Sequence, residues 1–323
     1  MQLTELPAVS APLPWQGEAW SRLTEQFAEG RLPHALLLAG EEGTGKSQLA
    51  LALARMLLCA APRDGLGCGE CPACEYSASG VHGDFRWLQP EGDSRVIKVD
   101  QVRELVGFLN QTAGFGQRKV AVLAPADTMN VAAYNALLKS LEEPAGDTVV
   151  ILVCHRVHNV LATIRSRCQM LRLATPSEAS SLAWLDGLTG DNAASRALLQ
   201  LSDGKPMLAE RLYLNGGAEE LQARRAVVRA LLEGRADPVS VTGLWQDIGV
   251  DAFLDQVTAD LQQELSTLDG DGLRRAGPAG FGLLDELSGL RRAVAGGSNP
   301  NRELLLETIL SKVQRQLGPL LTR

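Results

Sequence analysis

The sequence has no excess of basic residues and no clusters that combine basic and aromatic side chains. Its 323 residues include 31 Lys and Arg against 38 Asp and Glu, a net charge of −7. Because neutralising the phosphates of a duplex takes concentrated Lys and Arg, this balance argues against a protein that binds duplex nucleic acid by itself. It also makes a zinc-dependent nucleic-acid binder a weak assignment.

Signals for secretion or for a membrane are missing as well. The opening stretch, MQLTELPAVSAPLPW, lacks a cationic start followed by an apolar core, and no apolar run reaches membrane-spanning length. We therefore expect a cytoplasmic protein with no membrane contact. Disulfides are rare in that reducing compartment, so the spacing of the six cysteines bears on metal binding rather than on disulfide pairing.

A phosphate-binding loop is the first motif that carries chemistry. Residues 40–47 read GEEGTGKS, between a short apolar run and a helical pattern from Lys46 to Leu58. Such a loop holds phosphate with backbone N–H groups and a helix N-terminus, while its Lys reaches the outer phosphates and its Ser ligates Mg²⁺. A loop retained as a scaffold with an idle pocket is the alternative. The residues predicted to bind ATP or ADP with Mg²⁺ are Gly40, Gly43, Thr44, Gly45, Lys46 and Ser47.

Four cysteines follow this helix closely. Cys59, Cys68, Cys71 and Cys74 have the spacing C-x8-C-x2-C-x2-C, and four thiolates suit tetrahedral Zn²⁺. Because four sulfur ligands leave no open coordination position, we expect a structural zinc module at about residues 59–74, in a segment too poor in apolar residues to fold alone. The two remaining cysteines, at 154 and 168, are expected to be buried core thiols.

The apolar pattern changes along the chain. Up to about residue 173, short apolar runs alternate with amphipathic helices, which predicts an α/β domain with a parallel sheet. One of these helices is expected from about Met129 to Glu143. The predicted strands are Ala35–Ala39, Phe85–Leu88, Lys119–Leu123, Thr148–Val153 and Gln169–Leu173.

From residue 176 onward only helical segments are expected. Gly-rich breaks separate them, among them RRAGPAGFG at residues 274–282. The final segment, residues 301–317, is amphipathic. Its predicted apolar side carries Leu304, Leu305, Thr308, Ile309 and Val313.

Residues 119–144, KVAVLAPADTMNVAAYNALLKSLEEP, are similar to the AAA+ clamp-loader subunits. In those ATPases the strand runs into a D-E-A-D-like box, whose acidic pair positions Mg²⁺ and polarises the attacking water. Here the first two acidic places are Ala124 and Pro125, which can do neither. Asp127 stands at the fourth place and is expected to cap the next helix, and a structural role is expected for Asp84.

Residues 166–168, Ser-Arg-Cys, resemble the S-R-C motif of the same family. The resemblance implies that Arg167 is an arginine finger for the ATP site of an adjacent subunit, whereas by itself the residue reads as a cation at a helix end. Two other places depart from active loaders. Met207 stands where a lid arginine touches the outer phosphate, with Lys205 nearby as a partial substitute, and Cys154 stands where a polar residue follows the fourth strand.

The resemblance covers nearly the whole chain and is strongest to the delta-prime family of bacterial DNA polymerase III, through PWQ, RLPHALLLAG, NALLKSLEEP, RSRC and NRELLLE. It implies an AAA+ nucleotide-binding-type domain at 1–174, a helical lid at 175–214 and an all-α collar for oligomerisation at 215–323. It also implies a stator without intrinsic catalysis, which helps load the sliding clamp on primed DNA. The implied partners are the gamma/tau motor subunits and the delta subunit through the collar, the sliding clamp, and primer-template DNA mainly via the complex.

Two other functions stay open at this point. An ATP-hydrolysing motor subunit of the same machine fits the intact loop, but Ala124 and Pro125 count against it. A P-loop phosphotransferase would need an acceptor pocket with its own base, and the helical C-terminal half and the Ser-Arg-Cys match count against that function.

Overall fold

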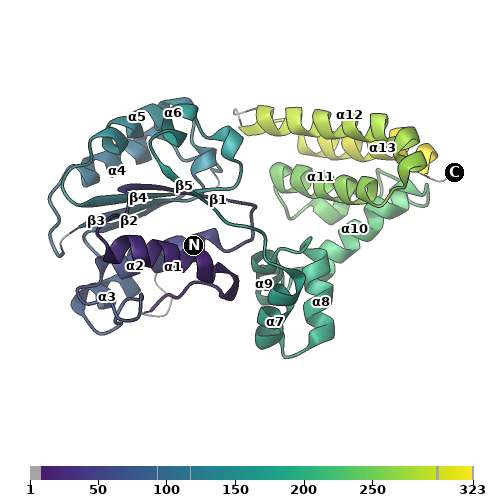
Figure 1. Cartoon of the computed structure of the whole chain (residues 1–323). Helices are drawn as coiled ribbons and strands as arrows, with labels where there is room; N and C mark the ends of the chain where they lie inside the picture. Colours follow the sequence, from purple (N-terminus) through teal and green to yellow (C-terminus); the bar gives the residue numbers. More distant parts are fainter. Residues whose placement is uncertain (1–8, 93, 117, 296–297, 322–323) are drawn as a thin grey trace. The chain divides into compact units, whose positions relative to one another are not determined.

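Five short apolar segments form one parallel sheet (Figure 1). In this computed structural model, which describes residues 9–92, 94–116, 118–295 and 298–321, the strands are β1 (Ala35–Ala39), β2 (Phe85–Leu88), β3 (Lys119–Leu123), β4 (Thr148–Cys154) and β5 (Gln169–Arg172). Their order is β2-β3-β4-β1-β5, and neighbouring strands are parallel. All five predicted strands are confirmed; β4 ends one residue later than expected and β5 one residue earlier.

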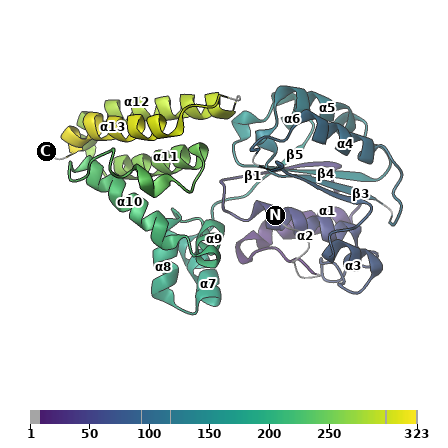
Figure 2. The same ribbon diagram turned by 180° about the vertical axis from the view of Figure 1, so that it is seen from behind.

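Helices cover both faces of this sheet, as a fully buried parallel sheet requires. One face carries α1 (Gly17–Ala28) and α2 (Lys46–Leu58); the other carries α4 (Val99–Leu109), α5 (Val131–Glu142) and α6 (Ala162–Arg165) (Figures 1 and 2). Side chains of β4 alternate between the two apolar cores. Val153 packs on the α1 and α2 side, whereas Leu152 and Cys154 pack on the side of α4, α5 and α6.

Contacts divide the chain into two compact units, the first ending at Arg211 and the second beginning at Leu212. Besides the sheet, the first unit holds a short helix in the cysteine segment, α3, and the helices that follow β5. The predicted domain limits at 174/175 and 214/215 stay predictions. The further elements of this unit are η1 (Pro14–Gln16), α3 (Pro72–Ala78), η2 (Ala126–Thr128), η3 (Val157–Asn159), α7 (Glu178–Thr189), α8 (Asn192–Leu201) and the start of α9 (Pro206–Asn215).

The second unit is helical throughout its described residues. Its elements are α10 (Ala218–Leu232), η4 (Thr242–Trp245), α11 (Val250–Ser266), α12 (Gly270–Ala295) and α13 (Arg302–Leu321). α12 packs against α11 and α13, and α13 also packs against α10. None of the helices in the described parts of the chain has the length and apolar character needed to cross a bilayer.

One expectation for this unit is wrong, and another is confirmed only in part. No break occurs at residues 274–282, because α12 continues through Pro278. Gly280 allows close packing of α12 on α11, because a Cβ at this position would lie 2.7 Å from side-chain atoms of Leu265. In α13 the residues Leu304 and Thr308 are exposed. The other three predicted residues, Leu305, Ile309 and Val313, are buried as expected. The core face also includes Leu306, Leu310 and Leu317, which lie beside them on α13.

Candidate functional site

The Gly-Lys-Ser loop lies between the carboxyl end of β1 and the start of α2. Gly43 and Gly45 have left-handed backbone, with φ of +78° and +87°, which glycine adopts without steric cost. At Gly40 a Cβ atom would come within 2.5 Å of the carbonyl oxygen of Leu173. The shape and surroundings of the loop therefore require glycine at all three positions.

The turn η1 braces the loop from one side. The indole N–H of Trp15 donates to the carbonyl of Thr44 at 3.0 Å, and the amide of the buried Gln16 donates to the carbonyl of Gly45 at 2.9 Å. Leu13 also touches the loop, since a Cβ at Gly45 would lie 2.2 Å from its Cδ1. Sequence reasoning missed these roles because the contacts join residues 29 positions apart; the tripeptide PWQ was their only signal.

The connection between α8 and α9 braces the other side of the loop. The backbone N–H of Met207 donates to the carbonyl of Gly43 at 3.1 Å, and a Cβ at Gly43 would lie 3.0 Å from Cβ of Lys205. Met207 is buried and uncharged, so it offers nothing to a phosphate. Lys205 is the cation that this connection brings next to the loop.

Lys46 is buried at the start of α2, and its ammonium donates to the carbonyl of Glu41. Burial lowers the pKa of Lys46 to about 8, and the carboxylates of Asp127 and Glu42 act in the opposite direction. The hydroxyl of Thr44 donates to the same Glu41 carbonyl at 2.9 Å. Together with the backbone N–H groups of the loop, this ammonium can hold a phosphate group.

The two positions after β3 carry no acid. β3 ends at Leu123, and Ala124 and Pro125 follow it. Hydrolysis of a nucleotide on a P-loop needs a carboxylate in this region to hold Mg²⁺ and groups that orient the attacking water. An alanine methyl group and a proline ring supply neither function.

The expectation that Asp127 caps the next helix is wrong. Its carboxylate oxygens accept the backbone N–H groups of His155 at 2.9 Å and Arg156 at 3.0 Å. α5 begins at Val131, later than expected, and Asn130 is its N-cap residue. Asp127 is therefore too early in the chain to cap α5 and instead ties η2 to the segment after β4.

The polar residue that follows the fourth strand is His155, one position beyond the expected Cys154. The side chain of Cys154 is buried in the core on the α4 and α5 side, and burial raises the pKa of its thiol to about 12. Burial lowers the pKa of His155, and the Lys46 ammonium lowers it further. Strand alternation explains the difference, because the last residue of β4 points into the core. Cys168 is only half-buried, against the same core.

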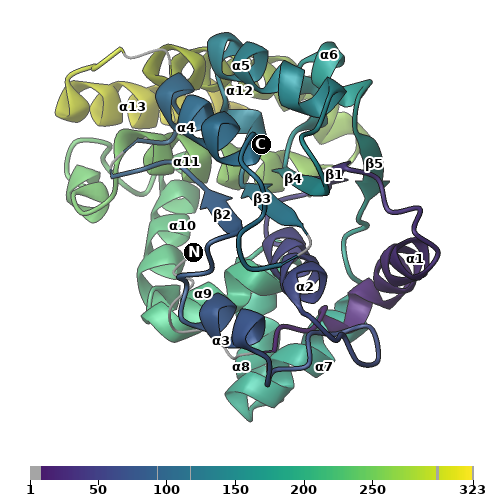
Figure 3. The same cartoon turned by 90° about the vertical axis from the view of Figure 1, so that its left-hand side faces the viewer.

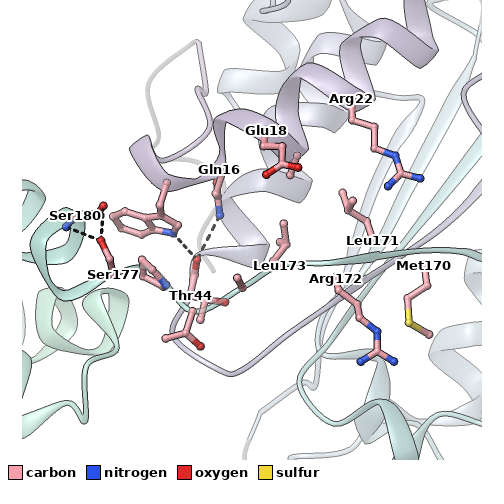
Figure 4. A pocket seen from close by; sticks show the side chains of 15 residues that line it. Gln16, Glu18, Arg22, Thr44, Met170, Leu171, Arg172, Leu173, Ser177 and Ser180 are labelled. Carbon is pink, nitrogen blue, oxygen red and sulfur yellow. Dashed lines mark hydrogen bonds between the residues drawn. The ribbon is translucent and has the colours of Figure 1, made fainter.

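A cavity of about 710 Å³ adjoins the loop at Thr44. The start of α1, strand β5 and the link from β5 to α7 line it (Figure 4). The guanidinium groups of Arg22 and Arg172 lie toward one end and Ser177 toward the other. Its volume is in the range of small-molecule sites. Figure 3 shows how α1 stands beside the edge strand β5.

The four predicted zinc ligands come together. The sulfur atoms of Cys59, Cys68, Cys71 and Cys74 all lie within 4.8 Å of one another, with 3.9 Å between Cys59 and Cys71 and 4.0 Å between Cys68 and Cys74. Zn–S bonds of about 2.3 Å in a tetrahedron separate sulfurs by roughly 3.8 Å. Backbone N–H groups of Glu70 and Cys71 lower the pKa of Cys68 to about 6, whereas burial raises the pKa of Cys59 and of Cys74, so the geometry and not the pKa values carries the assignment. These residues therefore fit a zinc ion.

Arg55 connects the cysteine segment to the helix of the phosphate-binding loop. This buried residue of α2 donates to the hydroxyl of Ser10 at 2.7 Å and to the carbonyl of Ser77 in α3 at 3.2 Å. Cys74, also on α3, is buried. The cysteine segment is therefore anchored directly on α2.

Arg167 lies between α6 and β5, and carboxylate and carbonyl oxygens hold its guanidinium group. Nε donates to Oε1 of Glu142 at 2.7 Å, and Nη2 pairs with the same oxygen. Nη1 donates to the carbonyl of Thr163 at 2.8 Å. The contact with the last turn of α6 agrees with a cation at a helix end, but the side chain stays 34% exposed.

Arg167 and the phosphate-binding loop lie at opposite ends of the sheet. The loop follows the carboxyl end of β1, whereas Arg167 precedes the amino end of β5, and the two strands are parallel neighbours paired from Leu36–Gln169 to Ala39–Arg172. A strand of that length separates them by roughly 10 Å. Arg167 therefore lies at the end of the sheet opposite the loop of its own chain.

Known proteins are similar to this chain over nearly its whole length. The family model described as DNA polymerase III, delta subunit, matches residues 15–177. The DNA polymerase III subunit delta' of Pseudomonas aeruginosa is 39% identical over 95% of this chain and 98% of its own length, and that of Escherichia coli K12 is 32% identical over 95% and 96%. A solved DNA polymerase III gamma subunit-related protein from Thermotoga maritima has a TM-score of 0.48 and 18% identity, over 93% of this chain and 99% of that one. The chain therefore belongs to the DNA polymerase III delta-prime subunit family.

Proposed function

We propose that this chain is a non-hydrolysing stator subunit of the DNA polymerase III clamp loader, where it helps place the sliding clamp on primed DNA in the cytoplasm. The observation that carries the proposal is the missing acid pair. Ala124 and Pro125 stand where the chemistry needs carboxylates, and both oxygens of Asp127 accept backbone N–H groups. A loop that holds phosphates without these acids binds a nucleotide but does not accelerate its hydrolysis.

The intact loop supports binding of ATP or ADP with Mg²⁺. In this proposal Gly40, Gly43, Thr44, Gly45 and Lys46 surround the phosphates and the Ser47 hydroxyl ligates Mg²⁺, which would neutralise phosphate charge. Lys205 adds a cation from the lid. The same intact loop favours the rival function, an ATP-hydrolysing motor subunit, and the positions after β3 argue against it.

Arg167 acts, in this proposal, on the ATP site of a neighbouring subunit. Its place at the end of the sheet opposite its own loop supports a role in trans. A guanidinium suits this role because it is always charged and can stabilise charge that spreads over the transferred phosphoryl group.

The helical second unit, with the collar assigned to 215–323, contacts the gamma/tau and delta subunits in this proposal, and residues 175–214 form the lid. Exposed apolar side chains on α12, Leu273 and Phe281, support an interface there. Zinc held by the four cysteines has a structural role. Contacts with the sliding clamp and primer-template DNA are made mainly through the assembled complex.

Gel filtration of the chain with the motor and delta subunits, combined with ATPase measurements before and after mixing, tests this function. We expect co-elution as one complex and no ATP turnover by the chain alone. Turnover by the pure chain at about 1 s⁻¹, abolished by Lys46→Ala, would contradict the stator assignment in favour of the motor.

A further inference from the structure

Glu142 is the residue that holds Arg167. It is the last residue of α5, and its Oε1 atom accepts Nε of Arg167 at 2.7 Å and pairs with Nη2. Nη1 donates to the carbonyl of Thr163 at 2.8 Å, with the hydroxyl of Ser166 at 3.4 Å. These partners come from two separate helices, so the direction of the guanidinium is set from two sides.

Glu142 leaves open the edge of the guanidinium that Nη1 and Nη2 form. The group has five N–H donors in a fixed planar fork. Glu142 accepts from the side edge formed by Nε and Nη2, and Thr163 accepts from Nη1. The second N–H of Nη2 has no acceptor among the described residues, and Nη1 has, besides Thr163, only the hydroxyl of Ser166 at 3.4 Å. The edge formed by Nη1 and Nη2 is therefore bound less tightly than the edge on Glu142, and it has the bidentate geometry in which arginine binds phosphate oxygens.

Stability of α5 does not explain a glutamate at this position. The carboxyl end of a helix carries partial negative charge, and cations are the residues that stabilise it. Glu142 is followed by a second acid, Glu143, so two carboxylates stand where a cation would serve the helix better. The contact with Arg167 gives the first of them a role.

We propose that Glu142 is a positioning residue for Arg167, which holds the guanidinium so that its open edge faces the ATP site of the neighbouring subunit. This inference rests on the proposed arginine-finger role. A guanidinium oriented in advance loses less conformational freedom when it meets the phosphoryl group. If Glu142 instead blocked the finger, it would occupy the edge that phosphate needs, and the contacts of Glu142 leave that edge open.

The experiment uses the reconstituted clamp loader and measures clamp- and DNA-stimulated ATPase against ATP concentration. The variants are Glu142→Ala, Glu142→Gln, Arg167→Ala and the double variant Glu142→Ala/Arg167→Ala. Glu143→Ala is the matched control, because it removes the same charge from the adjacent, exposed position. Gel filtration verifies that each complex contains its full set of subunits, and Glu142→Gln, which keeps volume and one acceptor oxygen, replaces Glu142→Ala if that complex does not assemble.

We expect Glu142→Ala to lower kcat about threefold with KM for ATP unchanged, because positioning acts in the transition state. The kcat of the Glu142→Gln complex should lie between those of Glu142→Ala and the native complex, and the kcat of Glu143→Ala should equal the native value. When Arg167 is already Ala, adding Glu142→Ala should leave kcat unchanged. The positioning role is overturned if Glu142→Ala and Glu142→Gln turn over ATP at the native rate or faster while Arg167→Ala is slow. In that case the arginine-finger role of Arg167 still stands. Native turnover with Arg167→Ala overturns the finger itself, and the positioning role with it.

Discussion

At the scale of single residues, Asp84 shows how a carboxylate can stay charged although its side chain is almost fully buried. Its oxygens accept the backbone N–H groups of Gly114 at 2.8 Å, Phe115 at 2.7 Å and Gly116 at 3.1 Å, and Lys119 lies at 3.5 Å. Burial by itself would raise the pKa of Asp84, but these N–H groups and the Lys119 ammonium hold it below its usual value. This agrees with the expected structural role.

Asp84→Asn should therefore destabilise the chain by about 3 kcal/mol, since it leaves Lys119 buried without its partner. Because the folded pKa of Asp84 lies below the unfolded value of about 3.9, the native advantage is present at neutral pH and is lost as the pH falls below about 4. Urea unfolding at several pH values measures this. Asp147→Asn is the control. Asp147 forms an ion pair with Arg118, its side chain is about half exposed, and the pair should contribute less than about 1 kcal/mol to the free energy of unfolding. Equal effects of the two substitutions would contradict the account.

Single positions show where sequence reasoning stops. The four cysteines and the glycines of the loop follow spacing rules, because their chemistry demands fixed intervals along the chain. Gln16 and His155 follow no such rule, since distant segments bring them to the loop. The sequence pattern predicts a helix that begins just after Asp127, but α5 begins at Val131, so Asp127 is not its N-cap residue.

At the scale of elements, we propose that the cysteine segment depends on a metal for its fold. Its four sulfurs come together from a segment in which α3 is the only helix of the described residues between α2 and β2. We expect one Zn²⁺ per chain in protein purified without added metal, measured by elemental analysis. A chelator should then release the ion and expose residues 59–78 to protease while the sheet stays folded. Less than about half an equivalent of zinc, with four freely titrating thiols, would contradict the zinc module.

The strands were predictable because buried parallel strands are short apolar runs between turn residues. Helix α12 was not predictable in this way, because glycine and proline usually break helices. Within α12, Pro278 is tolerated and Gly280 allows close packing on α11. The same helix presents Leu273 and Phe281 one turn on each side of Gly277, where a Cβ would lie 3.5 Å from both. Leu273 and Phe281 are therefore two exposed apolar side chains on one face of α12, next to the buried Gly277.

Phe281→Ser should weaken assembly of the complex about tenfold, because an exposed aromatic anchor contributes strongly to an interface. Stability of the isolated chain should stay the same, as the side chain is 54% exposed. Analytical ultracentrifugation with the partner subunits measures the affinity. Leu188→Ser, at an exposed position on α7, is the control and should leave assembly unchanged; a native affinity for Phe281→Ser would remove α12 from the proposed interface.

At the scale of the whole molecule, two sites at opposite ends of one sheet have different roles in the proposed function. In this proposal the loop end binds nucleotide although it has no acid pair, and the other end presents an arginine with an open edge. A chain built this way contributes to hydrolysis only beside a subunit whose own acids are in place. The sequence predicts both ends by motif, but their separation follows only from the strand pairing.

The most direct measurement compares Lys46→Ala and Arg167→Ala in the assembled clamp loader, by clamp- and DNA-stimulated ATPase. The account predicts that Lys46→Ala keeps near-native turnover, because this chain does not perform the chemistry. Arg167→Ala should reduce turnover roughly tenfold, less than the 10³ to 10⁵ of a single-site finger, because a loader has several sites. Loss of turnover with Lys46→Ala together with native turnover for Arg167→Ala would contradict the account.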